Sequence, residues 1–144
     1  MIDRKGRDRL ALALRRYLIG RITNDDLEEV DVDWRDRGAM AVKQRSWHLY
    51  SDHHSYYRTG KDVLPWEVRR EVARWIVFLS SSQEYLWPES RMDVGGWFWQ
   101  KRRLEQFKQA GDFEVWPFID QTAFNAARKA PRYFARRNIV PEGS

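Results

Sequence analysis

The sequence predicts a mainly α-helical fold, a compact bundle of five or six helices. Apolar residues recur every three or four positions in several segments, which is the period of an amphipathic helix. Apolar residues form 42% of the chain and charged residues 33%, a globular composition. The 144 residues contain no repeat and no low-complexity linker, so we expect one domain over 1–144, with 139–144 as a disordered tail.

The first half of the chain predicts three helices. Residues 7–19 place leucines at four-residue spacing, and Gly20 is expected to end this helix. Thr23 or Asn24 offers a side-chain oxygen to free backbone N–H groups, which predicts the start of a short helix. Apolar spacing predicts a third helix over 36–52. Residues 53–64 are expected to form a loop.

The second half of the chain predicts three more helices and suggests one short strand. Residues 65–80 show the widest apolar face, and Pro65 suits the first helical position. Residues 83–96 are expected to be irregular, and 97–110 to be helical. Residues 113–116 alternate apolar and polar side chains, which suggests one short strand, and a last helix is expected over 120–130.

The composition also limits the function classes. The chain has no cysteine, which excludes disulfides, thiolate metal ligands and a cysteine nucleophile. Its apolar runs are too short for a membrane span, and no secretory signal is evident. The sequence implies no cofactor, and we expect a cytoplasmic protein without membrane contact.

Two aromatic segments resemble a group of small bacterial proteins of unknown function. The first segment covers 69–79 and continues into Glu-Tyr-Leu-Trp-Pro at 84–88. The second is Gly-Asp-Phe-Glu-Val-Trp-Pro-Phe at 111–118. The resemblance implies a bacterial, cytoplasmic protein and transfers no catalytic residue to this chain.

Charge is segregated along the chain. Residues 25–36 hold seven carboxylates against Arg35 alone, whereas 128–137 hold five cations and no acid. Such segregation steers a binding partner or only keeps a protein soluble. A patch of each sign is typical of docking between proteins or of self-association.

A run of three aromatic residues precedes a cationic run at 97–103. Successive residues of a helix are about 100° apart, so one core cannot bury all three rings. Exposed rings beside cations suit a protein interface or single-stranded nucleic acid, although one ring could instead cover a core edge. The candidate binding residues are Trp97, Trp99, Lys101, Arg102 and Arg103.

A metal-dependent hydrolase is a further alternative. The metal candidates are His48, Asp52, His53 and His54, with His48 and Asp52 on one helix face. Ordinary surface histidines near a helix end explain the same cluster. A second candidate metal site is the acidic pair Asp112 and Glu114, which would share one side of the suggested strand. The chain has no Gly-x-Ser-x-Gly elbow and no phosphate-binding glycine loop.

These patterns together favour a non-enzymatic, bacterial protein-interaction module of the adaptor, regulator or toxin-neutralising type. The expected partner is another protein, and self-association into a homo-oligomer is compatible with the charges. Nucleic-acid binding through the aromatic and basic surface is the first alternative, and metal-dependent hydrolysis is the second.

Overall fold

The computed structural model describes residues 1–50, 55–88 and 105–129, and these residues form a compact, mainly helical bundle, which confirms the predicted fold class. Residues 105–110 are also helical, and the described part of the chain contains no strand. The α-helices are α1 (Arg4–Leu18), α2 (Asn24–Glu28), α3 (Arg37–Ser46), α4 (Trp66–Leu79) and α6 (Gln121–Lys129). The 3-10 helices are η1 (Trp47–Leu49), η2 (Gly60–Asp62) and η3 (Phe113–Val115).

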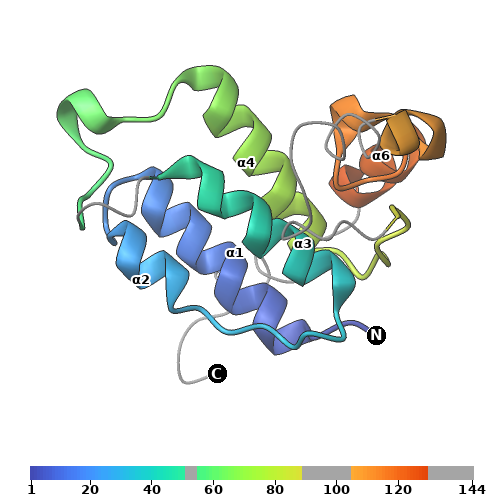
Figure 1. The fold of residues 1–144 in the computed structure, drawn as a ribbon, viewed down its shortest axis with the longest axis horizontal. Coiled ribbons are helices and arrows are strands. Elements are labelled where there is room, and N and C mark those ends of the chain that lie inside the picture. Colours follow the sequence, from blue (N-terminus) through green and yellow to red (C-terminus); the bar gives the residue numbers. More distant parts are fainter. Residues whose placement is uncertain (51–54, 89–104, 130–144) are drawn as a thin grey trace.

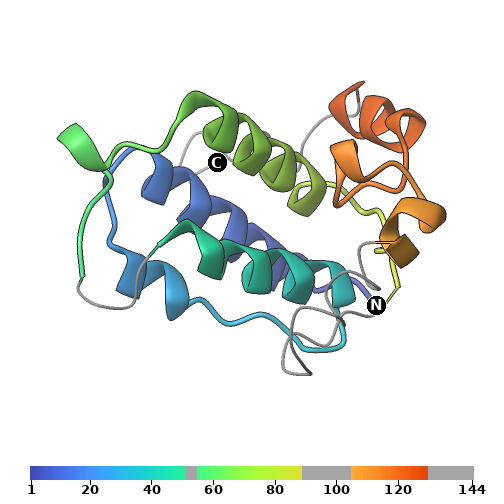
Figure 2. The same ribbon diagram turned by 45° about the horizontal axis from the view of Figure 1, so that its top comes forward.

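Helix α1 lies at the centre of the bundle, and α2, α3 and α4 all pack against it (Figure 1). Helix α4 runs antiparallel to α1, and α6 packs on α4 (Figures 1 and 2). This arrangement gives the molecule two ends. The proximal end holds the N-terminus, the start of α1 and the end of α4. The distal end holds the end of α1, the end of α3 with η1, the starts of α2 and α4, and the connection 55–65.

Local capping explains where the first helices begin and end. The Asp3 side chain accepts a hydrogen bond from the Gly6 N–H at the start of α1. Gly20 follows the end of α1 with φ of +75°, a conformation that favours glycine, as its predicted role requires. Thr23 and Asp26 form a reciprocal capping box that starts α2, which confirms the predicted cap.

Several predicted boundaries differ from the observed elements, and α1 begins at Arg4, three residues before the predicted start. The helix expected over 36–52 ends at Ser46 and continues as η1. Pro65 precedes α4 as its cap residue instead of occupying the first helical position. Within the expected loop 53–64, residues 60–62 form η2.

The strand suggested for 113–116 is wrong, because these residues form η3 and the turn after it. The Asp112 side chain caps η3 by accepting from the Glu114 N–H at 3.1 Å. A lone strand would lack a pairing partner, whereas η3 satisfies its own backbone. Asp112 and Glu114 therefore do not form the acidic pair that a strand would present.

The core combines the inner faces of α1, α3 and α4 with a group of aromatic rings contributed by 75–124. The Trp75 and Trp116 rings meet edge to face at 5.9 Å between centroids, and the Trp87 and Phe107 rings lie 5.2 Å apart. Fully buried side chains in this core include Leu10, Leu14, Val42, Val72, Phe78, Leu79 and Phe118.

Candidate interaction surface

The predicted binding residues lie outside the described part of the chain. This holds for Trp97, Trp99, Lys101, Arg102 and Arg103, so their surface stays a prediction. Of the metal candidates, Asp52, His53 and His54 also lie outside it, and only His48 is described.

His48 is exposed in η1 and not on a continuous helix that would bring it beside Asp52. Among the described residues, no group of three or more histidine or acidic side chains is placed to hold a metal ion. The metal-site hypothesis therefore gains no support from residues 1–50, 55–88 and 105–129.

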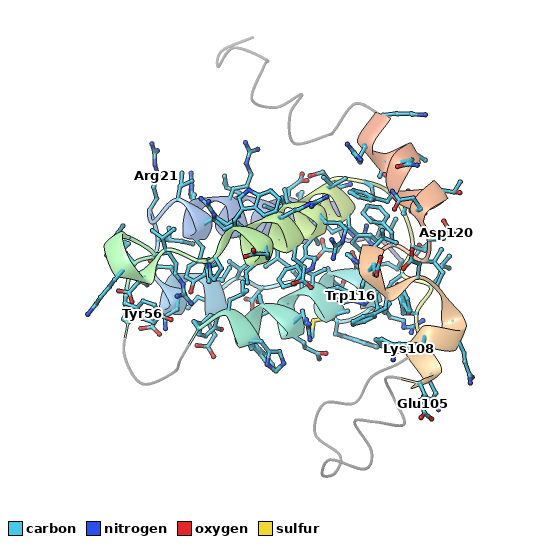
Figure 3. All side chains as sticks on the ribbon, turned by 90° about the horizontal axis from the view of Figure 1, so that it is seen from above. Arg21, Tyr56, Glu105, Lys108, Trp116 and Asp120 are labelled. Atoms are coloured by element: carbon cyan, nitrogen blue, oxygen red, sulfur yellow. The ribbon has the colours of Figure 1, made fainter. Side chains whose placement is uncertain are left out.

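The described tryptophans divide into a buried set and an exposed set. Trp75, Trp87 and Trp116 are buried in the core, whereas Trp34, Trp47 and Trp66 are exposed. The Trp87 indole N–H donates to the Pro117 carbonyl at 3.0 Å, and the Trp116 indole N–H donates to the Tyr85 hydroxyl at 3.0 Å. A buried indole needs such a partner, so Trp87 and Trp116 serve the core. Figure 3 shows Trp116 inside the molecule.

Trp34 is the most exposed of the large apolar side chains in the described residues, at 76%. It lies in the turn 33–36, which we call the Trp34 turn. The Asp36 N–H donates to the Asp33 carbonyl at 3.0 Å and closes the turn. The Asp33 N–H donates to the Asp3 carboxylate at 2.8 Å, and the Arg35 guanidinium pairs with Asp33 at 2.8 Å. The backbone that carries Trp34 is therefore held from several sides.

The strongest anchor of the Trp34 turn is a buried ion pair between Arg7 and Asp36. Arg7 Nε donates to Asp36 Oδ2 at 2.7 Å and Arg7 Nη2 donates to Asp36 Oδ1 at 3.0 Å, a two-point contact with both side chains almost fully buried. Arg7 Nη1 also donates to the carbonyls of Ser81 and Gln83 after α4, at 3.3 and 2.9 Å. This one guanidinium therefore links α1, the start of α3 and the segment after α4.

The carboxylate of Asp36 is stabilised in its charged form. Burial raises the pKa of Asp36, but the hydrogen bonds from Arg7 and from the Asp3 and Ala39 N–H groups outweigh burial and hold it below its ordinary value. Hydrogen bonds from the Arg35 side chain and N–H lower the pKa of the partly buried Asp33 to about 2. Both carboxylates of the Trp34 turn are therefore charged at neutral pH.

Gly38 allows α3 to approach this ion pair closely. A Cβ atom on Gly38 would lie 2.7 Å from the Phe78 ring and 3.1 Å from Arg7 Nη2. The Arg7 guanidinium itself lies 4.8 Å from the centre of the Phe78 ring. Glycine at position 38 thus leaves room for the stack of Phe78, Arg7 and Asp36 that anchors the Trp34 turn.

The structure corrects the predicted acidic patch. Asp36 is not on the surface, and Asp33 is paired with Arg35, so neither offers a free negative charge to a partner. The reason is a tertiary contact with Arg7, twenty-nine positions earlier in the chain. The exposed carboxylates that remain lie on α2 and in the segment after it: Asp25, Asp26, Glu28, Glu29 and Asp31.

Trp34 is not predicted as a binding residue from the sequence, because it lies in a polar segment without apolar periodicity. One signal was present: a single indole between Asp33 and Arg35, in a segment where no helix or strand is predicted, has no apolar face to join.

A second set of exposed apolar side chains lies at the distal end. Ile19, Tyr57, Val63 and Trp66 come from the end of α1, the connection 55–65 and the start of α4. Figure 3 shows Arg21 extending away from the ribbon at this end. The two ends of the molecule thus each expose tryptophan, in different surroundings.

Comparison of the chain with protein-family models, curated protein sequences and solved structures found no match. No helix among the described residues has the length and apolar character needed to cross a lipid bilayer.

Proposed function

We propose that this protein is a non-enzymatic interaction module of the adaptor, regulator or toxin-neutralising type, which binds another protein through Trp34 and the neighbouring acidic segment. The observation that carries the proposal is the 76% exposure of Trp34 on a turn fixed by hydrogen bonds and the Arg7–Asp36 ion pair.

The Trp34 turn has the physical properties of a binding hot spot. Tryptophan contributes more binding energy at protein interfaces than most residue types. A turn that is already ordered loses little conformational entropy when a partner binds, so more of the contact energy appears as affinity. Trp34 makes no contribution to the core that would otherwise explain its presence.

The exposed carboxylates of the chain segment that precedes the Trp34 turn favour a partner with a basic surface. Asp31 is exposed three residues before Trp34, and the other exposed carboxylates of this segment lie on α2 and at its end. Carboxylates of one sign accelerate the approach of a cationic surface and disfavour an anionic one. A protein that binds nucleic acid, or another protein with a lysine- and arginine-rich face, has the required chemistry.

Quantitative co-purification from the cells that naturally produce the protein tests the proposal. Three tagged forms are compared: the wild type, Trp34→Ala, and Leu86→Ala as a matched loss of an exposed apolar side chain elsewhere. We expect a basic protein to co-purify with the wild type and with Leu86→Ala. Less of that protein should co-purify with Trp34→Ala. With that protein purified, Trp34→Ala should weaken binding about tenfold or more. Equal recovery by Trp34→Ala and the wild type would reject the proposal.

The stretch from Trp97 to Arg103 remains a proposed second contact for the same partner. The double substitution Trp97→Ala with Arg102→Ala tests it in the same co-purification, and an unchanged set of partners would reject this second contact.

Nucleic-acid binding predicts a mobility shift of single-stranded DNA that weakens steeply with salt. Metal-dependent hydrolysis predicts bound metal and turnover with added divalent ions.

A further inference from the structure

The distal end carries a group of exposed side chains at the opposite end of α1 from the Trp34 turn. The connection 55–65 is tied to the end of α1 and the start of α2 by hydrogen bonds. Arg58 Nε donates to the Tyr17 hydroxyl at 2.7 Å, and the Tyr56 N–H donates to the Asn24 side chain at 2.9 Å. An isolated antiparallel bridge joins Thr23 to Tyr57. The segments of this end therefore form one fixed surface, which we call the distal surface.

The centre of the distal surface is apolar. Ile19 is 63% exposed and Trp66 is 60% exposed, and Tyr57 and Val63 are exposed beside them in the chain connection. Four of the eight exposed large hydrophobic side chains among the described residues thus come from the end of α1, the connection 55–65 and the start of α4, and Trp47 in η1 is a fifth at this end. Grouped apolar side chains on a surface mark an interaction site more often than single ones do.

Charges of both signs surround this apolar centre. The cations are Arg16 and Arg21 near the end of α1, Lys61 in the connection, and Arg69 and Arg70 on the first turns of α4; the Arg70 guanidinium lies 5.4 Å from the centre of the Trp66 ring. The acids are the exposed carboxylates of α2, with Glu67 as a single exposed acid on the first turn of α4. Within the described residues, no ion pair joins these cations to these acids.

We infer that the distal surface binds the distal surface of a second copy of this chain. In a two-fold symmetric contact, the cationic side of one copy faces the acidic side of the other, and each pairing occurs twice. The apolar residues meet at the centre, as in the core of a stable interface. A surface of one sign would repel its copy, and a polyanion would be repelled by the α2 carboxylates beside Arg21.

The side chains of the distal surface suit the size of a dimer interface. A stable interface buries about 800 Å² on each partner. A large aromatic side chain contributes on the order of 150–250 Å². Trp66 and Tyr57 with the aliphatic Ile19 and Val63 therefore supply much of the apolar centre, and the charged side chains of α1, α2 and α4 supply the rim.

Sedimentation velocity over a concentration series tests the inference on the full chain. We expect the wild type to form a dimer, and Trp66→Ala to raise the dimer dissociation constant about tenfold or more. Leu86→Ala, which removes an exposed apolar side chain at the proximal end, should leave the dimer unchanged. Circular dichroism confirms that each variant keeps its helices. A wild type that stays monomeric throughout, or a dimer that Trp66→Ala leaves intact, overturns the inference.

Charge exchange provides the stricter test. One variant combines Arg69→Glu with Arg70→Glu, and a second combines Asp25→Lys with Glu28→Lys. Each variant alone should self-associate more weakly than the wild type, because like charges then face each other across the two-fold axis. An equimolar mixture should restore a dimer, which is detected as a mixed species when one variant carries a size tag. A mixture that stays monomeric overturns the inference, whatever partner binds the Trp34 turn.

Discussion

Two regions of the proximal end are stabilised by different forces. In the aromatic region, which consists of the aromatic side chains of 75–88 and 105–118, rings pack edge to face and the indole N–H groups of Trp87 and Trp116 are hydrogen bonded inside the core. In the polar junction, formed by Asp3, Arg7 and Asp36, charge and hydrogen bonds connect three chain segments, and the nearby Trp34 stays outside. The comparison teaches that tryptophan here has two separate uses, one in the core and one on the surface.

The largest effect is expected in the aromatic region. Trp87→Ala removes a buried ring that packs on Phe107 and Phe113, and it should lower the free energy of unfolding by about 3–5 kcal/mol. Urea denaturation measures this change. The control is Leu86→Ala at the neighbouring exposed position, which should cost less than about 0.5 kcal/mol. Equal costs at positions 86 and 87 would show that the ring packing does not stabilise this region.

A loss of similar size is expected at the polar junction. Arg7→Met leaves the Asp36 carboxylate buried without its cation, which should lower the free energy of unfolding by about 3–5 kcal/mol. In the double variant Arg7→Met with Asp36→Leu, the cost should be smaller than the sum of the two single costs. A double-mutant cycle in urea gives the coupling energy. A coupling energy near zero would mean that the ion pair does not hold the junction.

Alkali should destabilise the aromatic region. Burial raises the pKa of Tyr85 to about 12, and burial raises the pKa of Tyr17 in α1 to about 12 as well. Because the unfolded phenols lose their protons near pH 10, the stability from each neutral phenol is present below pH 10 and is lost as the pH rises toward 12. Each of these two pKa shifts contributes roughly 2–3 kcal/mol to the free energy of unfolding below pH 10. Urea curves from pH 8 to 12 should show this loss, and Tyr85→Phe should reduce it by about half, since one of two phenols is removed.

Acid should destabilise the polar junction instead. The folded pKa of Asp36 is lower than that of an unfolded aspartate, so its stabilising contribution is present above about pH 4 and is lost as the pH falls through the folded pKa. Asp36→Asn should lower stability at neutral pH and flatten the acid side of the pH profile. Urea denaturation of the wild type and of Asp36→Asn, from neutral pH down through the folded pKa of Asp36, measures the difference. An unchanged acid profile in Asp36→Asn would assign the acid loss to other carboxylates.

The smallest effect on stability is expected at Trp34. Trp34→Ala should change the free energy of unfolding by less than about 0.5 kcal/mol, because the indole is outside the core. The same substitution should weaken binding of the proposed partner. A stability loss as large as that of Trp87→Ala would show that Trp34 serves the fold, and the contrast between the two tryptophans would disappear.

The helices could be predicted from the sequence because their signals are local. Leu10, Leu14 and Leu18 lie on one face of α1 at helical spacing, and Thr23 caps α2 by accepting from the Asp26 N–H, three residues later. Short elements were less predictable. Alternation over 113–116 suggested a strand, but a capping side chain at Asp112 and the absence of a neighbouring strand among the described residues favour a 3-10 turn there.

The candidate surface was predicted only in part. Acidic residues at 25–31 are exposed, as a run of charges predicts, but Asp36 in the same run is buried. Its environment depends on Arg7 and on carbonyls after α4, which no local pattern connects to it. Trp34 and Trp87 likewise cannot be separated by residue type, since only their tertiary contacts place one outside and one inside.

The amino-acid sequence by itself determined the helical elements, the Thr23 cap of α2, the charge segregation and the lack of cysteine chemistry, because each depends on residue identity or on neighbours within one or two helical turns. The tertiary structure alone decided which tryptophans are exposed, that Asp36 pairs with Arg7, and that exposed apolar and charged side chains meet at the distal end. Those properties depend on which distant segments pack together, and burial is a property of that packing.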